Sequence, residues 1–348
     1  MASLTQTAII TRKIIRYGLY AIVALIVGRI LFGTGVKIYK HFFPEPPPPP
    51  TVSFGRLPQL PFPEKQVPEN IRFTLETPEG ALPTFSSQAK VYFMPKPAQT
   101  QLNLDIAKET ASKLGFLSEA QKISEVIYRF AHRKSPSTLE MNIVTGFFSI
   151  SYNLETDPAP LEKRPPAPEI ASSLVRSYLS SADSLPEDLT GPTISEFLKV
   201  EEGGFTSVVS LSEANLVKIN FFRKSFDNLP SKTPDPNKAN VWFMVSGARE
   251  REKQIVASEF HYFSVDEDQS ATYPIKLARE VWEELAAGAG YVANLGDNSE
   301  GDIVIRRVYL AYYDPGLETE FYQPIVVFEG DREFVAYVPA ITTEYYGE

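Results

Sequence analysis

The chain has 348 residues, of which 43% are hydrophobic and 12% aromatic, so it is long and apolar enough to bury a sizeable core. It contains no cysteine, which excludes disulfides, thiolate metal sites and a cysteine nucleophile. The net charge is −9, and residues 1–36 hold four basic and no acidic residues, so the remaining chain carries −13. A body this acidic argues against nucleic-acid binding, which requires clustered Lys and Arg.

An apolar segment near the N-terminus predicts a membrane anchor. Residues 17–36 have the length of a helix that crosses a bilayer, and basic residues lie on both sides of the segment. The positive-inside rule and the small size of residues 1–16 predict a cytoplasmic tail and an extracytoplasmic body. A cleaved signal peptide is the alternative, but Lys37 and Lys40 directly after the segment favour an uncleaved anchor.

Arg29 is the only charged residue within this segment. Its position in the C-terminal half favours a side chain that extends towards the outer headgroups. The second interpretation is an ion pair with an acidic residue on the transmembrane helix of another protein. Arg29 is therefore a candidate partner-binding residue.

A Pro-rich segment follows over residues 37–68. Ten of the 29 prolines fall between Pro44 and Pro68, and Pro46–Pro50 is an unbroken run. Polyproline II is extended and semi-rigid, so the composition predicts a spacer that holds a folded body away from the membrane. An SH3-type ligand is the alternative, which the lack of neighbouring basic residues disfavours.

The rest of the chain repeats one pattern, in which a helix is combined with antiparallel strands. Helices are predicted over 103–116, from Pro168 with the apolar stripe Ile170, Leu174 and Tyr178, and over 274–290. The pattern predicts an α+β fold in which helices pack on antiparallel sheets. The predicted parts are a tail (1–16), a transmembrane helix (17–36), a spacer (37–68), a first module (69–156), a Pro-rich linker (157–168), a second module (169–230) and a third module (231–348).

The third module contains candidate residues for binding a partner. Its helix is expected to pack on the sheet through Ile275, Ala278, Trp282 and Leu285. If Val308, Leu310 and Tyr312 face that helix, alternation places Tyr309 and Tyr313 on the free face of the strand. Tyrosine is favoured at binding surfaces, so Tyr309 and Tyr313 are the predicted partner-binding residues of the body.

No catalytic motif stands out. The histidines His41, His132 and His261 are isolated in sequence, and HExxH, GxSxG, P-loop and GxGxxG patterns are absent. We therefore predict no enzymatic activity, no cofactor and no metal, although a catalytic triad dispersed along the chain stays open. Acidic loops at 265–270 and 296–302 could offer oxygen ligands to a hard cation, but solvated turns are the favoured interpretation.

Residues 270–340 carry a resemblance to a known group of proteins. The matching positions are Trp282, Leu285, Gly288, Val308, Leu310, Tyr312, Tyr313 and Pro324. This pattern resembles YycI/YycH-type extracytoplasmic regulators and PepSY-like modules. The resemblance implies a non-enzymatic role, in which protein contacts modulate a membrane sensor kinase or a peptidase.

These observations predict a single-pass protein of the cell membrane whose extracytoplasmic body acts by contact with another membrane or envelope protein. Two alternatives from other classes stay open. One is an envelope hydrolase with a dispersed active site, and the other is a passive scaffold or ligand-binding module.

Overall fold

The computed structural model describes residues 4–42, 48–64, 71–98, 100–201, 204–298 and 301–347. The chain divides into two compact units, residues 1–49 and residues 50–348. Two prolines of the run Pro46–Pro50 and residues 65–68 of the expected spacer lie outside the described residues.

The first unit is one helix, α1 (Leu4–Phe42). Its stretch Arg16–Lys37 has a mean hydropathy of 2.0 and is unburied within the unit. A helix of this length and composition can cross a membrane, and it extends beyond the hydrocarbon core because 39 residues span about 58 Å. The N-terminal apolar helix expected over 17–36 is therefore confirmed.

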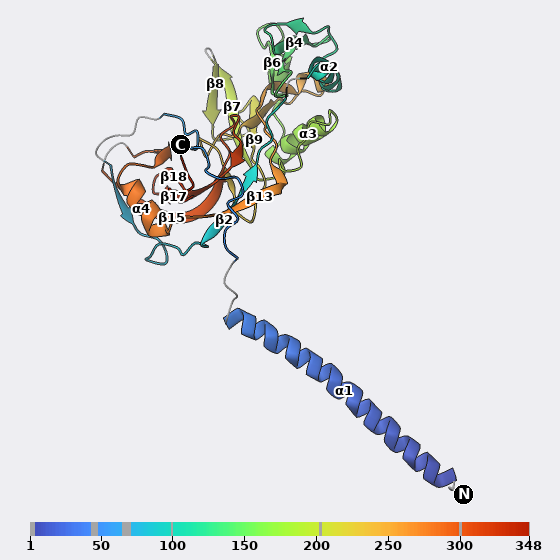
Figure 1. Cartoon of the computed structure of the whole chain (residues 1–348). Helices are drawn as coiled ribbons and strands as arrows, with labels where there is room; N and C mark the ends of the chain where they lie inside the picture. Colours follow the sequence, from blue (N-terminus) through green and yellow to red (C-terminus); the bar gives the residue numbers. More distant parts are fainter. Residues whose placement is uncertain are drawn as a thin grey trace. The chain divides into compact units, whose positions relative to one another are not determined.

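A nine-stranded antiparallel sheet forms one half of the second unit (Figure 1). Its spatial order is β3-β4-β5-β6-β12-β11-β9-β7-β8. In that order the bounds are Gln121–Lys122, Ile127–Ala131, Ser137–Asn142, Phe148–Tyr152, Ile255–Phe260, Val241–Val245, Leu216–Phe221, Thr193–Glu201 and Gly204–Val208. The short 3₁₀ helices η1 (Ala159–Leu161) and η2 (Arg251–Lys253) lie in its connections.

Two helices cover one face of this sheet. The helix α2 (Asn103–Lys113) buries Ala107 and Ala111 against the sheet. Gly115, with a φ of +100°, turns the chain out of the helix. The amide of Phe116 then donates to the carbonyl of Ala111, which completes a Schellman motif and places Phe116 in the core. Small residues at the contact let the helix approach the sheet closely.

The second helix, α3 (Pro168–Ser180), begins at the predicted proline. Its buried residues are Ala171, Ser172, Val175 and Leu179. Of the predicted stripe, Leu174 and Tyr178 are partly buried against the same core, but Ile170 is 61% exposed, so the prediction is wrong for Ile170. The reason is that the small side chain of Ala171 allows a closer approach of the helix than Ile170 would.

The other half of the unit has two further sheets. A six-stranded sheet has the order β1-β15-β17-β18-β14, with β10 also beside β15, and a three-stranded sheet has the order β13-β2-β16. The bounds are β1 Ile71–Leu75, β2 Gln88–Phe93, β10 Ser231–Lys232, β13 Asp266–Pro274, β14 Tyr291–Asn294, β15 Gly301–Tyr313, β16 Phe321–Tyr322, β17 Pro324–Gly330 and β18 Val335–Pro339. β1 and β10 pair with β15 in parallel, and the remaining pairs are antiparallel.

The α+β fold class is confirmed, but the sheets do not follow the expected modules. β11 and β12 belong to the expected third module. In the sheet they lie between β6 of the expected first module and β9 of the expected second module. β1 and β2 of the expected first module pair instead with β15 and β13. Residues 50–348 therefore form one compact unit rather than three modules separated at 157–168 and 231.

The helix α4 (Ala278–Ala286) packs on the six-stranded sheet. Its buried residues are Ala278, Val281 and Leu285, while Trp282 is partly buried and its ring lies 6.1 Å from that of Phe328. Trp282 was expected to be buried in this contact together with Ala278 and Leu285, but it is only partly buried. Val281 takes the central position because it lies between Ala278 and Leu285 on the helix face that meets the sheet.

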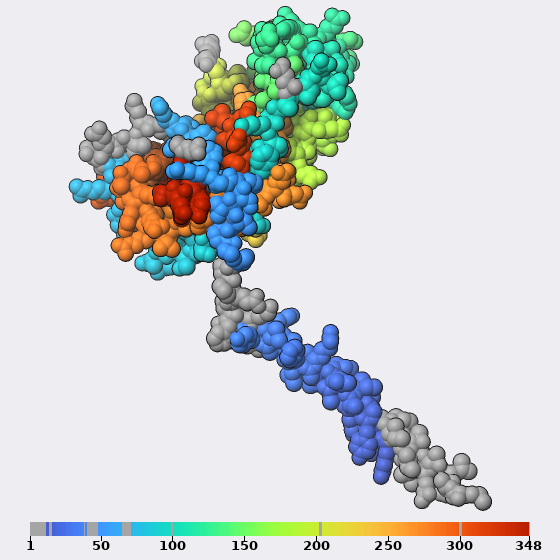
Figure 2. Space-filling view, viewed as in Figure 1, coloured from blue at the N-terminus to red at the C-terminus, as the bar shows by residue number. Residues whose placement is uncertain are grey.

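Residues 50–64, which we call the strap, pack against both faces of the six-stranded sheet: Leu57 joins the cluster that contains α4, whereas Leu60 and Phe62 lie on the opposite face. Leu57 is fully buried and Leu60 is 7% exposed. The Leu57 amide donates to the carbonyl of Tyr345 at 2.8 Å, and the Leu57 carbonyl accepts from Gly347 at 2.9 Å. In Figure 2 the strap, in blue, lies on the surface beside the dark red C-terminal residues.

The strap also makes aromatic contacts with the sheet. Phe62 stacks on Tyr291 with ring centroids 4.9 Å apart, and it meets the edge of Tyr313 at 4.8 Å. The described part of the segment from residue 50 onwards is therefore integrated into the core. The expected spacer over 37–68 is wrong for residues 50–64, because apolar residues between the prolines bind this stretch to the sheet.

We expect a truncated chain that begins at Pro50 to be soluble and to unfold cooperatively, whereas one that begins at Glu69 should melt at a lower temperature. The second loses the burial of Leu57 and Leu60, each worth about 1.5–3 kcal/mol. Thermal unfolding of both chains measures the difference. Equal melting temperatures would show that the strap contributes nothing to the core.

A pair of substitutions controls this experiment. In the chain that begins at Pro50, Leu57→Ala should cost about 2–5 kcal/mol because it leaves a cavity. Leu317→Ala changes a leucine that is 57% exposed and should stay within about 0.5 kcal/mol of the parent chain.

Candidate functional site

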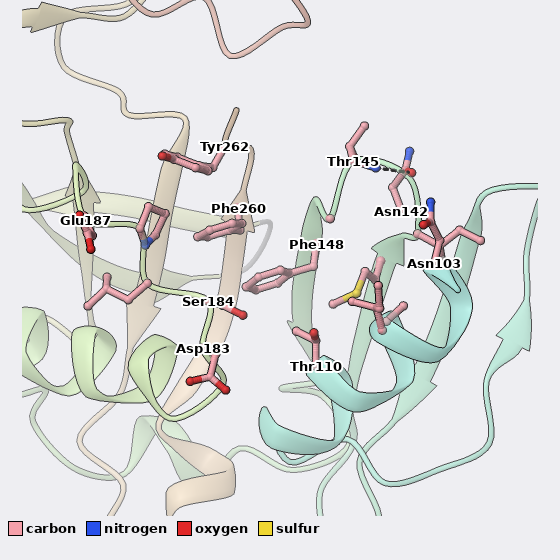
Figure 3. Close-up of a pocket in the computed structure, with 17 residues that line it drawn as sticks. Asn103, Thr110, Asn142, Thr145, Phe148, Asp183, Ser184, Glu187, Phe260 and Tyr262 are labelled. Carbon is pink, nitrogen blue, oxygen red and sulfur yellow. Dashed lines mark hydrogen bonds between the residues drawn. The ribbon is translucent and has the colours of Figure 1, made fainter. Parts of the chain in front are cut away.

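A cleft of about 440 Å³ opens beside α2 on the nine-stranded sheet (Figure 3). It is the candidate functional site, because an apolar hollow with a few polar groups at its edge is the usual form of a ligand site. Its walls come from α2, the β5–β6 turn, the loop after α3 and the segment that follows β12. The 17 lining residues are Asn103, Ile106, Ala107, Thr110, Met141, Asn142, Ile143, Thr145, Gly146, Phe148, Asp183, Ser184, Leu185, Pro186, Glu187, Phe260 and Tyr262.

The floor of the cleft is apolar. Met141, Phe148 and Phe260 come from three strands of the sheet and are each less than a tenth exposed. The rings of Phe148 and Phe260 stack with centroids 4.7 Å apart. Ile106 on α2 forms part of the wall and is 58% exposed. These groups offer a ligand apolar surface on a rigid support.

The β5–β6 turn is held in shape by Asn142. Its Oδ1 accepts hydrogen bonds from the amides of Val144 at 2.9 Å and Thr145 at 3.2 Å, the second of which is drawn in Figure 3. Gly146 follows with a φ of +74° and donates to the carbonyl of Asn142. An Asn at this place favours such a turn because its side chain caps the free amides.

The loop after α3 forms the opposite wall. The amide of Ser184 donates to the carbonyl of Leu179, and that of Asp183 donates to the carbonyl of Ser180. These two bonds make a Schellman motif with Asp183 in the left-handed conformation, at a φ of +51°. The motif turns the chain out of α3 and places residues 183–187 along the cleft.

A buried ion cluster lies behind this wall. Arg223 is 3% exposed, and its Nη1 and Nε donate to the carboxylates of Asp188 and Asp314, the second at 2.7 Å. Burial disfavours the charge, but Asp314 and Asp188 outweigh it and raise the pKa of Arg223. Tyr262, which lines the cleft, donates its hydroxyl to Asp188 at 2.7 Å. The cluster therefore supports the cleft wall from within.

The two histidines with described side chains do not form a catalytic triad in the contacts observed. His132 Nδ1 lies 2.9 Å from Ser135 Oγ and accepts from the Lys134 amide, and burial lowers the pKa of His132. His261 Nε2 lies 3.3 Å from Glu259 Oε2, and its ring stacks on Phe147. The side chain of His41 lies outside the described residues. The absence of enzymatic activity stays a prediction.

The acidic loop expected at 265–270 is in fact the start of β13, which carries a register shift there. Asp266 Oδ1 accepts from the amides of Asp268 and Gln269, so this carboxylate is occupied within its own turn. The loop at 296–302 includes residues 299 and 300, which lie outside the described part of the chain. Among the described residues, no group of three His, Cys, Asp or Glu is arranged to hold a metal.

The predicted partner-binding residues do not line the cleft. Tyr313 is 1% exposed, packed under the strap with Phe62, so its expected place on a free face is wrong. Tyr309 is partly buried on the same side and donates its hydroxyl to Glu329. Val308 and Leu310 do face the cluster that contains α4, as expected. The error arose because the strap was interpreted as a spacer that left this face uncovered.

Arg29 is exposed on α1 within the stretch that can cross a membrane. Nothing in the first unit tests an ion pair between Arg29 and another protein, so its role stays a prediction.

Sequence reasoning missed the cleft. Its residues come from four separate stretches of the chain, and none carries a recognisable motif. The one local signal is Ile106, which lies off the stripe of Ala107, Ala111 and Leu114 and is an exposed aliphatic residue beside a buried helix face.

Substitution of Tyr313 should show that its buried hydroxyl does not contribute to stability. The Tyr313 hydroxyl is buried without a hydrogen bond among the described residues, so Tyr313→Phe should leave stability unchanged or raise it by about 1 kcal/mol. Tyr337 is equally buried but donates to the carbonyl of Thr233 at 3.1 Å, so Tyr337→Phe should cost about 1 kcal/mol. Chemical denaturation of both variants tests this contrast, and a clear loss of stability in Tyr313→Phe would contradict it.

No family model matches the chain, and no curated protein matches it. Among solved structures, an uncharacterised protein from Eubacterium rectale ATCC 33656 is similar at 13% identity and a TM-score of 0.41, covering 81% of this chain and 92% of that chain. The C-terminal domain of YpeB from Bacillus megaterium, a PepSY-containing protein, is similar at 11% identity and a TM-score of 0.33, covering 72% of this chain and 96% of that chain. Both scores lie below 0.5, so no functional argument rests on them, and the YycI-type resemblance is not shown.

Proposed function

We propose that this is a membrane-anchored, extracytoplasmic binding protein whose cleft beside α2 receives a segment of another membrane or envelope protein. The observation that carries the proposal is the cleft itself, whose floor is formed by the buried side chains of Met141, Phe148 and Phe260 and whose wall carries the exposed Ile106. A cleft with an apolar lining and a few polar groups at its edge is the usual form of a binding site.

The membrane anchor supports the same proposal. The stretch Arg16–Lys37 meets the length and hydropathy of a membrane span, and the basic residues before it favour a cytoplasmic N-terminus. An anchor raises the local concentration of the body near partners in the same membrane. Modulation of a sensor kinase or of another envelope complex is one role that such a protein would fill.

The topology can be tested in cells that express the whole chain. Protease added to spheroplasts should degrade the body, and the intact protein should retain residues 1–36 because the anchor is not cleaved. Immunoblotting of the body and mass determination of the mature N-terminus measure both points. A protected body, or a mature N-terminus near Val36, would contradict the proposed topology.

Binding through the cleft can be tested with Ile106→Glu. A charge on the wall should weaken capture of the partner roughly ten- to a hundredfold, since burying an isoleucine is worth about 1.5–3 kcal/mol. The measurement is affinity capture by the full-length protein from solubilised membranes of the source organism.

Ile170→Glu is the matched control. Ile170 is 61% exposed on α3 and does not line the cleft, so this variant should capture the partner as the parent protein does. Both variants should keep the parent melting temperature, because both residues are at the surface. Equal loss of capture in the two variants, or no loss in either, would refute the proposed role of the cleft.

A further inference from the structure

Among the residues that the structure describes, the charged ones that line the cleft are all acidic. They are Asp183 and Glu187, and no described Lys, Arg or His is a lining residue. Both carboxylates lie in the loop after α3 and are labelled on the same wall in Figure 3. A ligand in the cleft therefore meets negative charge beside an apolar floor.

The charge of Asp183 is only partly compensated. Its Oδ2 lies 2.9 Å from Lys113 Nζ, but the same ammonium lies 2.7 Å from Glu109 Oε1. The three groups together carry a net charge of −1. A positively charged ligand is the natural complement of such a group.

The position of Asp183 is also unfavourable for an aspartate. Glycine is the preferred residue in the left-handed conformation that ends a helix, and the C-terminus of a helix disfavours negative charge by about 0.3–1 kcal/mol. The ion pair with Lys113 offsets part of this cost, and a cation bound in the cleft would offset more of it.

Glu187 is exposed, and no ion pair or hydrogen bond of its carboxylate occurs among the residues that the structure describes. Lys224 interacts with it electrostatically, but the Lys224 ammonium lies 2.7 Å from Glu267. The next residue, Asp188, points inward to Arg223. In this loop the carboxylate of Asp188 therefore lies in the core, whereas the carboxylate of Glu187 lies at the cleft.

The opposite wall of the cleft offers a hydrogen-bond donor to the backbone of a peptide ligand. The Oδ1 of Asn142 is occupied by the amides of its own turn, and its Nδ2 has no hydrogen bond among the described residues. This amide group can donate to a peptide carbonyl. An extended segment would then meet acidic, apolar and donor groups together.

We propose, on the basis of the function proposed above, that the cleft binds a polypeptide segment with a lysine or arginine flanked by apolar residues. The cationic side chain pairs with the carboxylates of Asp183 and Glu187, and its aliphatic stem and an apolar neighbour lie on the floor. The charge argument disfavours an anionic lipid headgroup, which the acidic wall would repel.

The probe for this proposal is a random-peptide library displayed on phage, and the bait is the full-length protein in detergent micelles. Peptides selected by the parent protein should be rich in Lys or Arg next to Leu, Ile, Phe or Met. Synthetic copies of the selected peptides should bind more weakly as salt increases, because the wall charges are near the surface.

The decisive variant is Glu187→Lys. It should weaken binding of the selected peptides roughly tenfold, since it replaces an attraction at the edge of the site by a repulsion. Asp183→Asn, which keeps a residue tolerant of the left-handed conformation, should weaken binding in the same direction. Glu213→Lys makes the same change of net charge on an exposed turn outside the cleft and should leave binding unchanged.

The outcomes distinguish this proposal from the function on which it rests. Peptides that lose binding with Ile106→Glu but show no cationic preference would overturn the charge selectivity and leave the binding cleft in place. Peptides that bind Ile106→Glu as well as the parent, or a library that yields none, would overturn both. A dimer that Ile106→Glu converts to a monomer would place a second copy in the cleft and also overturn the proposal.

Discussion

The second unit depends on one buried arginine. Arg223 follows β9 of the nine-stranded sheet, and Asp314 follows β15 of the six-stranded sheet. A third partner, the carbonyl of Phe263, follows β12. Removing such charges from water costs several kcal/mol for each ion, and only close partners offset this cost. The contacts of Arg223 therefore fix the arrangement of the two large sheets at the ends of their strands. Other arrangements would leave this buried charge without its partners.

The backbone around Arg223 is equally constrained. Gly191 lies so close that an added Cβ would be 2.1 Å from the Arg223 carbonyl oxygen, which excludes any other residue without movement of the chain. Asp188 belongs to the same connection and anchors the loop that forms one wall of the cleft. The contact between the two sheets therefore fixes the position of one cleft wall. Arg223 and Asp188 support this acidic wall, and neither of them lines the cleft.

The strap places a comparable constraint at the other end of the unit. Its hydrogen bonds to residues 345–347 bring the beginning and the end of the body together on the six-stranded sheet. From residue 50 to residue 64 the chain therefore contacts the sheet rather than extending as a free spacer. Prolines are compatible with this role, because they suit an edge segment that needs few backbone donors.

Several features were determined by the sequence alone. The span within α1, the start of α3 at Pro168 and the end of α2 at Gly115 follow from local rules of hydropathy, ring geometry and left-handed capping. These rules act over a few residues, so they need no knowledge of the rest of the chain. The α+β class followed in the same way from the alternation of helical and extended patterns.

Only the tertiary structure decided which surfaces are covered. Tyr313 and Ile170 were assigned the wrong exposure, because burial depends on the segment that arrives from elsewhere, the strap in one case and the close approach of Ala171 to the sheet in the other. The place of β11 and β12 between β6 and β9 is likewise a matter of long-range pairing. The cleft depends on both kinds of information, since its four stretches of chain meet only after the sheet has formed. Local pattern specifies elements, whereas sites arise from contacts between residues that are distant in sequence.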